Sequence, residues 1–224
     1  MYATLERYTS LLGLESLKES YSELHSFVDM VFYINLDHRV DRKEAIEAEL
    51  YKVGLPFERF PAIAHAFGAV GCSQSHLAVL KLARQRKYKR VLILEDDFMF
   101  KVSKDVFVKE MRDIHESNKP YDVCMIAYNV MRSVNAPEPF WKKIIDAQTL
   151  CGYLVNDHYY DTLIDLIEPS IPLLEQTQQK HIHAIDVVIK SVQPRDKWYH
   201  TTTRIGIQRP SYSDIEQRNV NYGV

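Results

Sequence analysis

Three consecutive carboxylates stand where a short apolar run ends. The run 91–94 leads directly into Glu95, Asp96 and Asp97. Adjacent ionised carboxylates repel one another, so holding them together needs a compensating cation. Because alternate side chains of an extended segment share a face, we expect Glu95 and Asp97 to point the same way. Two such oxygen donors suit Mg²⁺ or Mn²⁺, with the other positions left to water and phosphate. A solvated turn at a strand end is the alternative, and the spacing alone leaves both interpretations open.

A second polar group follows an earlier apolar run. Asn35, Arg39 and Arg42 place an amide and two guanidinium groups where an expected strand gives way to a helix. Helix N-termini attract anions, and arginine binds phosphate with a two-pronged fork. If both strand ends share one edge of a sheet, a cation site and an anion site lie close together. That layout suits a diphosphate bridged to a metal, although each arginine taken singly also fits an ordinary exposed helix start.

Strand-like apolar runs alternate with helical patterns along the chain. This alternation predicts a single α/β domain with a mostly parallel central sheet flanked by helices, and ligands gather beyond the carboxyl ends of such strands. Asp41 and Ser73 are expected to cap the first two helices. The expected strands are 30–36, 57–63, 91–94, 123–128 and 150–155, and the expected helices are 41–52, 74–86, 104–116, 159–167 and 184–192.

Composition limits the function classes. The chain has 224 residues, of which 46% are hydrophobic, and this is enough for one sizeable core. A formal net charge of −2 argues against a dedicated nucleic-acid binder. We recognise neither an apolar run long enough to span a bilayer nor a secretory signal, so we expect a cytoplasmic location. The three cysteines, Cys72, Cys124 and Cys151, lack paired spacing and are expected to be reduced, buried thiols.

Two further features lie outside the strand and helix pattern. Leucines recur at roughly helical intervals between Leu5 and Leu17, which predicts an amphipathic helical arm over 1–28 ahead of a domain over 29–224. The arm suits either an extra packed helix or a dimer contact. A basic cluster at 84–90 is typical of a solvated helix end, and contact with anionic lipid headgroups, which would make the protein membrane-peripheral, stays open.

Three stretches resemble glycosyltransferase family 25, and they occur in the family's order. The family's patterns are INLxxRxDR, GCxxSH and LEDD, and the matching segments are Ile34–Arg42, Gly71–His76 and Leu92–Asp97. Later segments agree more loosely, namely Leu150–Val155, Ile185–Asp186 and Gln208–Ile215. Together the three early motifs are specific, whereas any one alone is weak. The family includes bacterial lipooligosaccharide galactosyltransferases, and collagen galactosyltransferases carry a related domain.

The resemblance implies a GT-A-like, Rossmann-like fold, a UDP-sugar donor and a divalent metal, Mn²⁺ or Mg²⁺. It also implies transfer of galactose or glucose, with inversion, to a hydroxyl of a glycan, glycolipid or glycoprotein, as in lipopolysaccharide biosynthesis. Carried over by position, Asp97 and Glu95 would bind the metal. For His76, a hydrogen-bonded core histidine is the alternative to donor contact. The donor-binding residues implied are Asn35, Arg39, Arg42, Ser75, His76, Asp96, Gln208 and Ser213.

An inverting transfer needs a general base beside the acceptor hydroxyl. Asp186 is the candidate, since it stands alone in the apolar run 184–189 and a lone acid is costly to bury. The alternative is a helix N-cap, and the two roles can coexist. Whether His200 supplies a third metal ligand stays open.

Two other function classes fit the same residues. A metal-dependent phosphohydrolase or nucleotidyltransferase also uses paired acids with arginines. A non-catalytic carbohydrate-binding domain with a decayed site is the third class. One departure from the family pattern is the segment Ala69-Val70, which stands where an acidic residue often precedes the Gly-Cys pair.

Overall fold

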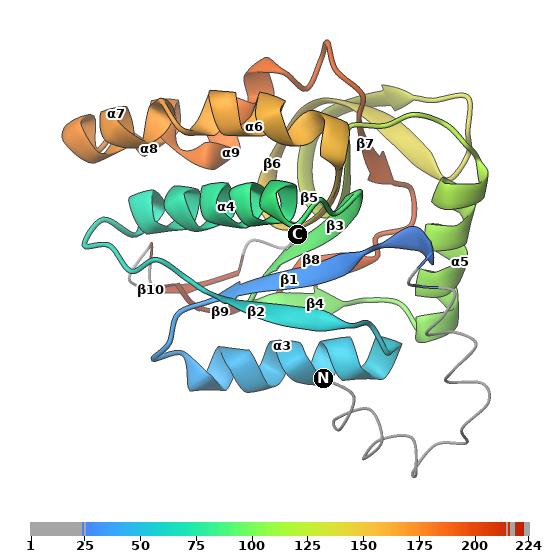
Figure 1. Ribbon diagram of the computed structural model, residues 1–224, viewed down its shortest axis with the longest axis horizontal. Helices are drawn as coiled ribbons and strands as arrows, with labels where there is room; N and C mark the ends of the chain where they lie inside the picture. Colours follow the sequence, from blue (N-terminus) through green and yellow to red (C-terminus); the bar gives the residue numbers. More distant parts are fainter. Residues whose placement is uncertain (1–23, 25, 214, 216–217, 222–224) are drawn as a thin grey trace.

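The chain folds around a central six-stranded sheet with the strand order β2-β1-β3-β6-β5-β7 (Figure 1). The computed structural model describes residues 24, 26–213, 215 and 218–221. Two small two-stranded sheets, β4 with β8 and β9 with β10, lie beside the central one. The strands are β1 (Met30–Asn35), β2 (Phe57–Pro61), β3 (Arg90–Glu95), β4 (Phe98–Phe100), β5 (Val123–Asn135), β6 (Trp141–Asn156), β7 (Trp198–Thr201), β8 (Gly206–Gln208), β9 (Ser211–Ser213) and β10 (Arg218–Val220).

Helices cover both faces of the sheet, with α4 and α6 on one side and α3 and α5 on the other (Figure 1). The α-helices are α3 (Val40–Val53), α4 (Gly68–Gln85), α5 (Lys104–Glu116), α6 (Tyr160–Ile167), α7 (Ser170–Thr177), α8 (Lys180–His183) and α9 (Ile185–Val188), and the 3₁₀ helices are η1 (Asp157–Tyr159) and η2 (Ile189–Ser191). The expected α/β domain with a central sheet flanked by helices is therefore present.

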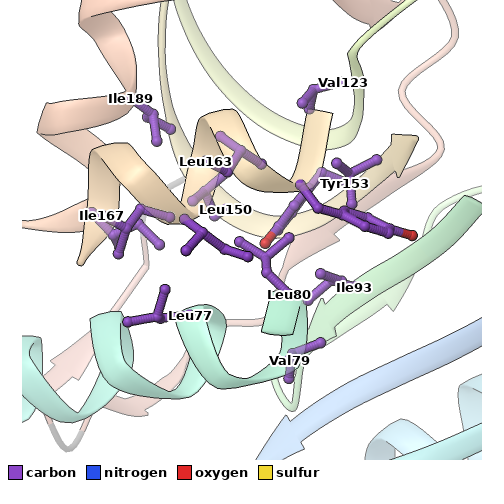
Figure 2. Packing of buried hydrophobic residues seen from close by; sticks show 14 of the residues in the cluster. Leu77, Val79, Leu80, Ile93, Val123, Leu150, Tyr153, Leu163, Ile167 and Ile189 are labelled. Carbon is purple, nitrogen blue, oxygen red and sulfur yellow. The ribbon is translucent and has the colours of Figure 1, made fainter. Parts of the chain in front are cut away.

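Each face of the sheet packs against its own hydrophobic cluster. Phe32 of β1 belongs to the cluster under α4 and α6, whereas its neighbours Val31 and Tyr33 belong to the cluster under α3 and α5. Successive strand residues point to opposite faces, so a strand covered on both sides is apolar throughout. Figure 2 shows the first cluster, in which Leu80 of α4 and Leu163 of α6 lie close to the sheet residue Tyr153.

The sheet is mostly parallel, as expected, because β1, β2, β3, β5 and β7 share one direction and only β6 of these six strands runs the other way. Strand β1 pairs in parallel with β2 and β3, but β6 runs antiparallel to β3, β5 and β7, so the sheet is mixed. A short connection joins β5 to β6, and short connections between adjacent strands produce antiparallel pairing. Both strands are also longer than expected. Their outer part carries exposed side chains, such as those of Met131 and Val134, and lacks the apolar pattern of a buried strand.

Two helix starts differ from the expected caps. Helix α3 begins at Val40 with Arg39 as its N-cap residue, so Asp41 lies in the first turn and does not cap it. Helix α4 begins at Gly68, which places Ser73 inside the helix, where its Oγ donates to the Ala69 carbonyl oxygen at 3.0 Å. Gly68 and Gly71 lower the helix propensity of this segment, so the sequence pattern indicates a later start for the helix. At Gly71 a Cβ would come within 2.4 Å of the Ile63 carbonyl oxygen, so the close packing of this helix requires glycine.

The expected N-terminal arm lies mostly outside the described residues, and its dimer role stays a prediction. Of its last residues, Leu24, Phe27 and Val28 are buried in the cluster under α3 and α5. Within the described ranges, none of the helices combines the length and apolar character needed to cross a bilayer. The basic cluster at 84–90 makes surface ion pairs, namely Arg84 with Asp161, Arg86 with Glu58 and Lys89 with Asp157.

Candidate functional site

The carboxyl ends of β1 and β3 bring the two polar groups of the sequence together. The strands are parallel neighbours in which Ile34 lies opposite Glu95. Just beyond that pair, the buried side chain of Asn35 donates from Nδ2 to Asp96 Oδ2 at 2.8 Å. The predicted proximity of the amide and the acidic triplet (Glu95, Asp96 and Asp97) is therefore confirmed.

Arg42 connects the start of α3 to the acidic triplet. Its Nη1 donates to Asp96 Oδ1 at 2.7 Å and to Asp97 Oδ2 at 3.2 Å. These ion pairs are largely buried, and although burial alone lowers the pKa of Arg42, the charges of Asp97 and Asp96 raise it overall. Arg42 is thus held ionised beside Asp96 and Asp97. Among the described residues, Arg39 makes no hydrogen bond to the acidic triplet; it pairs with Asp41 at 2.9 Å and reaches the Tyr212 carbonyl oxygen at 3.4 Å.

The C-terminal segment 206–213 lies against the triplet. Gln208 donates from Nε2 to Asp97 Oδ2 at 3.1 Å, and the Arg209 backbone N–H donates to the Asp97 carbonyl oxygen at 2.7 Å. Arg42 Nη2 donates to Ser211 Oγ and to the Tyr212 carbonyl oxygen, each at 2.7 Å. The segment is therefore tied both to the acids and to the arginine that faces them. Ser213 ends β9 opposite Arg218, and its donor-binding role stays a prediction.

Glu95 points to a different set of partners from those of Asp96 and Asp97. Its Oε1 lies 3.3 Å from His76 Nε2 and accepts from Cys72 Sγ at 3.7 Å. The buried His76 ring also stacks on Tyr153, whose hydroxyl lies 3.1 Å from Nδ1. His76 is thus a packed, hydrogen-bonded core histidine that also contacts the acidic triplet, so the two interpretations of this residue are compatible.

The three acids differ in their electrostatics. Burial raises the pKa of Asp97 to about 7, and the nearby charge of Glu95 adds to that shift. Burial also raises the pKa of Asp96. For Glu95, burial opposes ionisation, but the hydrogen bond and charge of His76 lower its pKa overall. A divalent cation would relieve the repulsion that burial intensifies around Asp97.

The donor atoms around Glu95 and Asp97 fit a divalent metal. Ligand atoms of Glu95, Asp97 and Cys151 lie within 4.8 Å of one another, and Cys151 Sγ donates to Asp97 Oδ1 at 3.4 Å. The carboxylate oxygens are the ligands that Mn²⁺ and Mg²⁺ prefer. Both oxygens of Asp96 already accept hydrogen bonds, from Asn35 and Arg42. Both oxygens of Asp97 also accept hydrogen bonds, Oδ1 from Cys151 and Oδ2 from Gln208 and Arg42, so hydrogen bonding does not separate the two aspartates. The assignment of Asp97 and Glu95 to a metal stays a prediction.

Asp186 lies near the same cluster, but not as a helix cap. The N-cap residue of α9 is Ala184, so the N-cap interpretation is wrong. Instead, Asp186 Oδ2 accepts from the Thr149 backbone N–H at 3.3 Å, at the start of the inner part of β6. Burial raises the pKa of Asp186 to about 6, and the charge of Glu95 contributes. The carboxylate thus titrates near neutral pH.

Two sequence candidates have local partners away from the acids. Ser75 Oγ donates to the Gly71 carbonyl oxygen at 2.6 Å and accepts from the Ile63 backbone N–H at 2.8 Å, so it fixes the segment ahead of α4. His200 is buried on β7 with Nδ1 2.9 Å from the Thr201 carbonyl oxygen. In the part of the chain that the structure describes, His200 joins no group of potential metal ligands.

Three residues of the site had no assigned role in the sequence. Arg59 on β2 donates from Nε to Asn35 Oδ1 at 2.9 Å, which fixes the Asn35 amide from its other side. Cys72 and Cys151 contact Glu95 and Asp97, and Cys72 is partly exposed, which corrects the expectation that all three thiols are buried. Arg59 could have been found from its strand, since β2 ends at the same sheet edge as β1.

Comparisons with known proteins give partial sequence matches. A glycosyltransferase 25 family member of Drosophila pseudoobscura pseudoobscura is 26% identical over 156 residues, which cover 56% of this chain and 24% of that protein. A glycosyltransferase 25 family member of Drosophila melanogaster is 29% identical over 101 residues, which cover 33% of this chain and 16% of that protein. The matches thus span about a quarter or less of either relative. No protein-family model matches the chain.

One solved structure shares the fold. It is a glycosyltransferase involved in the glycosylation of the major capsid of PBCV-1, with a TM-score of 0.53 and 9% identity over 84% of this chain and 95% of that one. At this identity the likeness concerns the fold alone, and it agrees with the expected GT-A-like class. The curated relatives support the resemblance to glycosyltransferase family 25 that the three ordered motifs indicate.

Proposed function

We propose that the chain is a metal-dependent glycosyltransferase that moves a hexose, galactose or glucose, from a UDP-sugar to a hydroxyl of a glycan or glycoconjugate with inversion. One observation carries the proposal. Asn35, Arg42 and Gln208, from three separate parts of the chain, all donate hydrogen bonds to Asp96 or Asp97 at one sheet edge. The name of the curated relatives supports the reaction class.

Both the acidic and the basic groups of the site would interact with the donor diphosphate. A divalent ion held by Glu95 and Asp97 supplies Lewis-acid stabilisation of the leaving diphosphate when it is bound. The Arg42 guanidinium, which is kept charged by its acidic neighbours, presents a fork that suits phosphate oxygens. Arg39 donates to the same Tyr212 carbonyl oxygen as Arg42 and would add a second guanidinium beside it. Gln208 ties the C-terminal segment to the same edge, and this segment, which also carries Ser213, would help exclude water from the reaction.

Asp186 is suited to act as the general base. A base works best when its pKa lies near the working pH, and burial places the pKa of Asp186 at about 6. The Thr149 N–H holds the carboxylate in place through Oδ2. In the proposed step, Asp186 removes the proton of the acceptor hydroxyl as that oxygen attacks the anomeric carbon and the bond to the diphosphate breaks.

Donor hydrolysis tests the proposal without a known acceptor, since slow transfer to water also releases the nucleotide. The assay offers UDP-, GDP- and CMP-sugars with Mn²⁺ and, in parallel, with EDTA. We expect UDP release from UDP-galactose or UDP-glucose, its loss with EDTA, and no inorganic phosphate. Release of inorganic phosphate would indicate a phosphohydrolase, and metal-dependent UDP binding without turnover on any acceptor would indicate a binding domain.

Two variants, one within the site and one on helix α5, test the assignment of Asp97. Asp97→Asn should abolish metal-dependent UDP release, because it removes a proposed metal ligand. Asp113→Asn is the control, since Asp113 lies on α5 and pairs with Lys109 of the same helix. Equal loss in both variants would contradict the assignment of Asp97.

A further inference from the structure

Cys72, His76 and Glu95 form a cluster of three different ligand types. Cys72 and His76 stand four residues apart on α4, so their side chains share one face of the helix. Glu95 reaches this face from the end of β3. The ligand atoms of all three side chains lie within 4.8 Å of one another. The cluster shares Glu95 with the pair Glu95 and Asp97, whereas Cys72 and His76 lie outside that pair.

The two distances to Glu95 within the cluster match a tetrahedral metal site. From typical zinc bond lengths, the edge between nitrogen and oxygen ligands is about 3.4 Å and that between sulfur and oxygen ligands is about 3.6 Å. In the protein, His76 Nε2 lies 3.3 Å and Cys72 Sγ lies 3.7 Å from Glu95 Oε1. Little rearrangement is therefore needed for an ion to replace the hydrogen bonds to Glu95.

The surroundings of the cluster also fit a metal. The Tyr153 hydroxyl lies 3.1 Å from His76 Nδ1, and a partner on the second ring nitrogen orients a histidine that binds metal through the first. Cys72 is partly exposed and the Glu95 side chain is 25% exposed, so an ion can enter from solvent. Water can then complete the coordination.

We propose that Cys72, His76 and Glu95 form a second divalent-cation site that prefers Zn²⁺ to Mn²⁺ or Mg²⁺. Thiolate and imidazole ligands favour Zn²⁺, and affinities of mixed sites rise from Mn²⁺ to Zn²⁺. Because Glu95 belongs to both ligand sets, zinc at this site withdraws Glu95 from the oxygen-rich pair with Asp97. Zinc should therefore inhibit the Mn²⁺-dependent reaction. This inhibition rests on the proposed function, whereas the zinc site itself does not.

Cobalt binding tests the site directly, without any donor or acceptor. The full chain is stripped of metal under reducing conditions and titrated with Co²⁺ while the thiolate-to-cobalt charge-transfer absorption is recorded. We expect this absorption in the wild type, its loss on adding Zn²⁺, and its persistence on adding Mg²⁺. Cys72→Ser should abolish it. Cys151→Ser and Cys124→Ala should retain it, because Cys151 faces Asp97 and Cys124 is buried in the core.

Two further variants test the orienting residue and the imidazole. Tyr153→Phe should keep the charge-transfer absorption but weaken Co²⁺ binding by about tenfold, the lower end for loss of a second-layer partner. His76→Gln should weaken Co²⁺ binding at least as much. Circular dichroism checks that this core variant folds. Absence of the absorption in the wild type, its survival in Cys72→Ser, or its loss in Cys151→Ser would overturn the proposal. None of these outcomes depends on whether the chain hydrolyses UDP-sugars.

Discussion

Asp97→Asn should stabilise the metal-free protein while it removes function. Asp97 is a buried carboxyl whose pKa rises from 3.8 to about 7, chiefly through burial. A folded pKa above the unfolded one means that ionisation opposes folding. The resulting penalty is absent below about pH 4, grows between about pH 4 and 7, and is complete above that.

The size of the effect follows from the pKa shift. A rise of about three pKa units at about 1.4 kcal/mol each corresponds to about 4 kcal/mol at pH 8. The net shift already includes the attraction of Arg42. Asparagine is neutral and can still accept the hydrogen bond from Gln208, but its amide NH₂ cannot accept the one from Cys151. We therefore expect a gain of about 2–4 kcal/mol in the free energy of unfolding at pH 8, which shrinks towards pH 4.

Urea denaturation in EDTA, followed by circular dichroism at several pH values, measures this gain. Asp113→Asn is the surface control and should change the free energy of unfolding by less than about 0.5 kcal/mol. The same Asp97→Asn protein should fail to bind UDP in the presence of Mn²⁺. A variant that is no more stable than wild type at pH 8 would refute the view that burial of the Asp97 carboxylate opposes folding.

Three further predictions test other parts of the account. Asp186→Asn should lower acceptor-dependent transfer by about 10²–10⁴-fold, the usual contribution of a general base, while UDP binding measured by calorimetry is retained; a variant with undiminished transfer would exclude Asp186 as the base. His200 is buried and burial lowers its pKa, so its neutral ring contributes stability that is lost as the pH drops below about 6.5, where the unfolded chain takes up the proton. The titration of Asp97 acts in the opposite direction over the same range, so the contribution of His200 is read from the difference between the wild-type and His200→Gln curves. The stability of wild type relative to His200→Gln should fall as the pH drops below about 6.5, and a difference that does not change with pH would contradict this. Asn35→Ala should cost about 1–3 kcal/mol in urea denaturation because it leaves buried partners on Asp96 and Arg59 unsatisfied, and a neutral effect would mean that water replaces the amide.

The strands that carry the acids were predictable because they are buried on both faces. An uninterrupted apolar run such as that of β1 or β3 has few alternatives to a central strand. Helix α5 was predicted with its observed bounds, since Ser103 caps it and its buried residues, such as Phe107 and Met111, recur at helical spacing. Local sequence is sufficient where one pattern decides both the type and the ends of an element.

The outer part of the β5–β6 ribbon was not predictable in the same way. Its residues pair with one another through several irregularities of register, and many are partly exposed. An irregular, half-exposed ribbon has neither a continuous apolar run nor a clean alternation. The antiparallel course of β6 follows from this ribbon, and it is the exception in the otherwise parallel sheet.

The contacts of the candidate site were also predictable only in part. Asn35 and the acids were placed together because β1 and β3 are parallel neighbours, which the α/β pattern implies. The contacts of Glu95 with Cys72 and His76 depend instead on how α4 packs on the sheet, and the position of Tyr153 depends on β6. Such tertiary contacts leave no spacing rule in the sequence.

A crystal of the protein soaked with UDP and Mn²⁺ tests the central claim most directly. Anomalous scattering locates the manganese, and the electron density locates the diphosphate. The account predicts manganese bound by carboxylate oxygens of Glu95 and Asp97, with the diphosphate between the metal and the Arg42 guanidinium. A diphosphate bound away from Arg42, or manganese bound without either carboxylate, would contradict it.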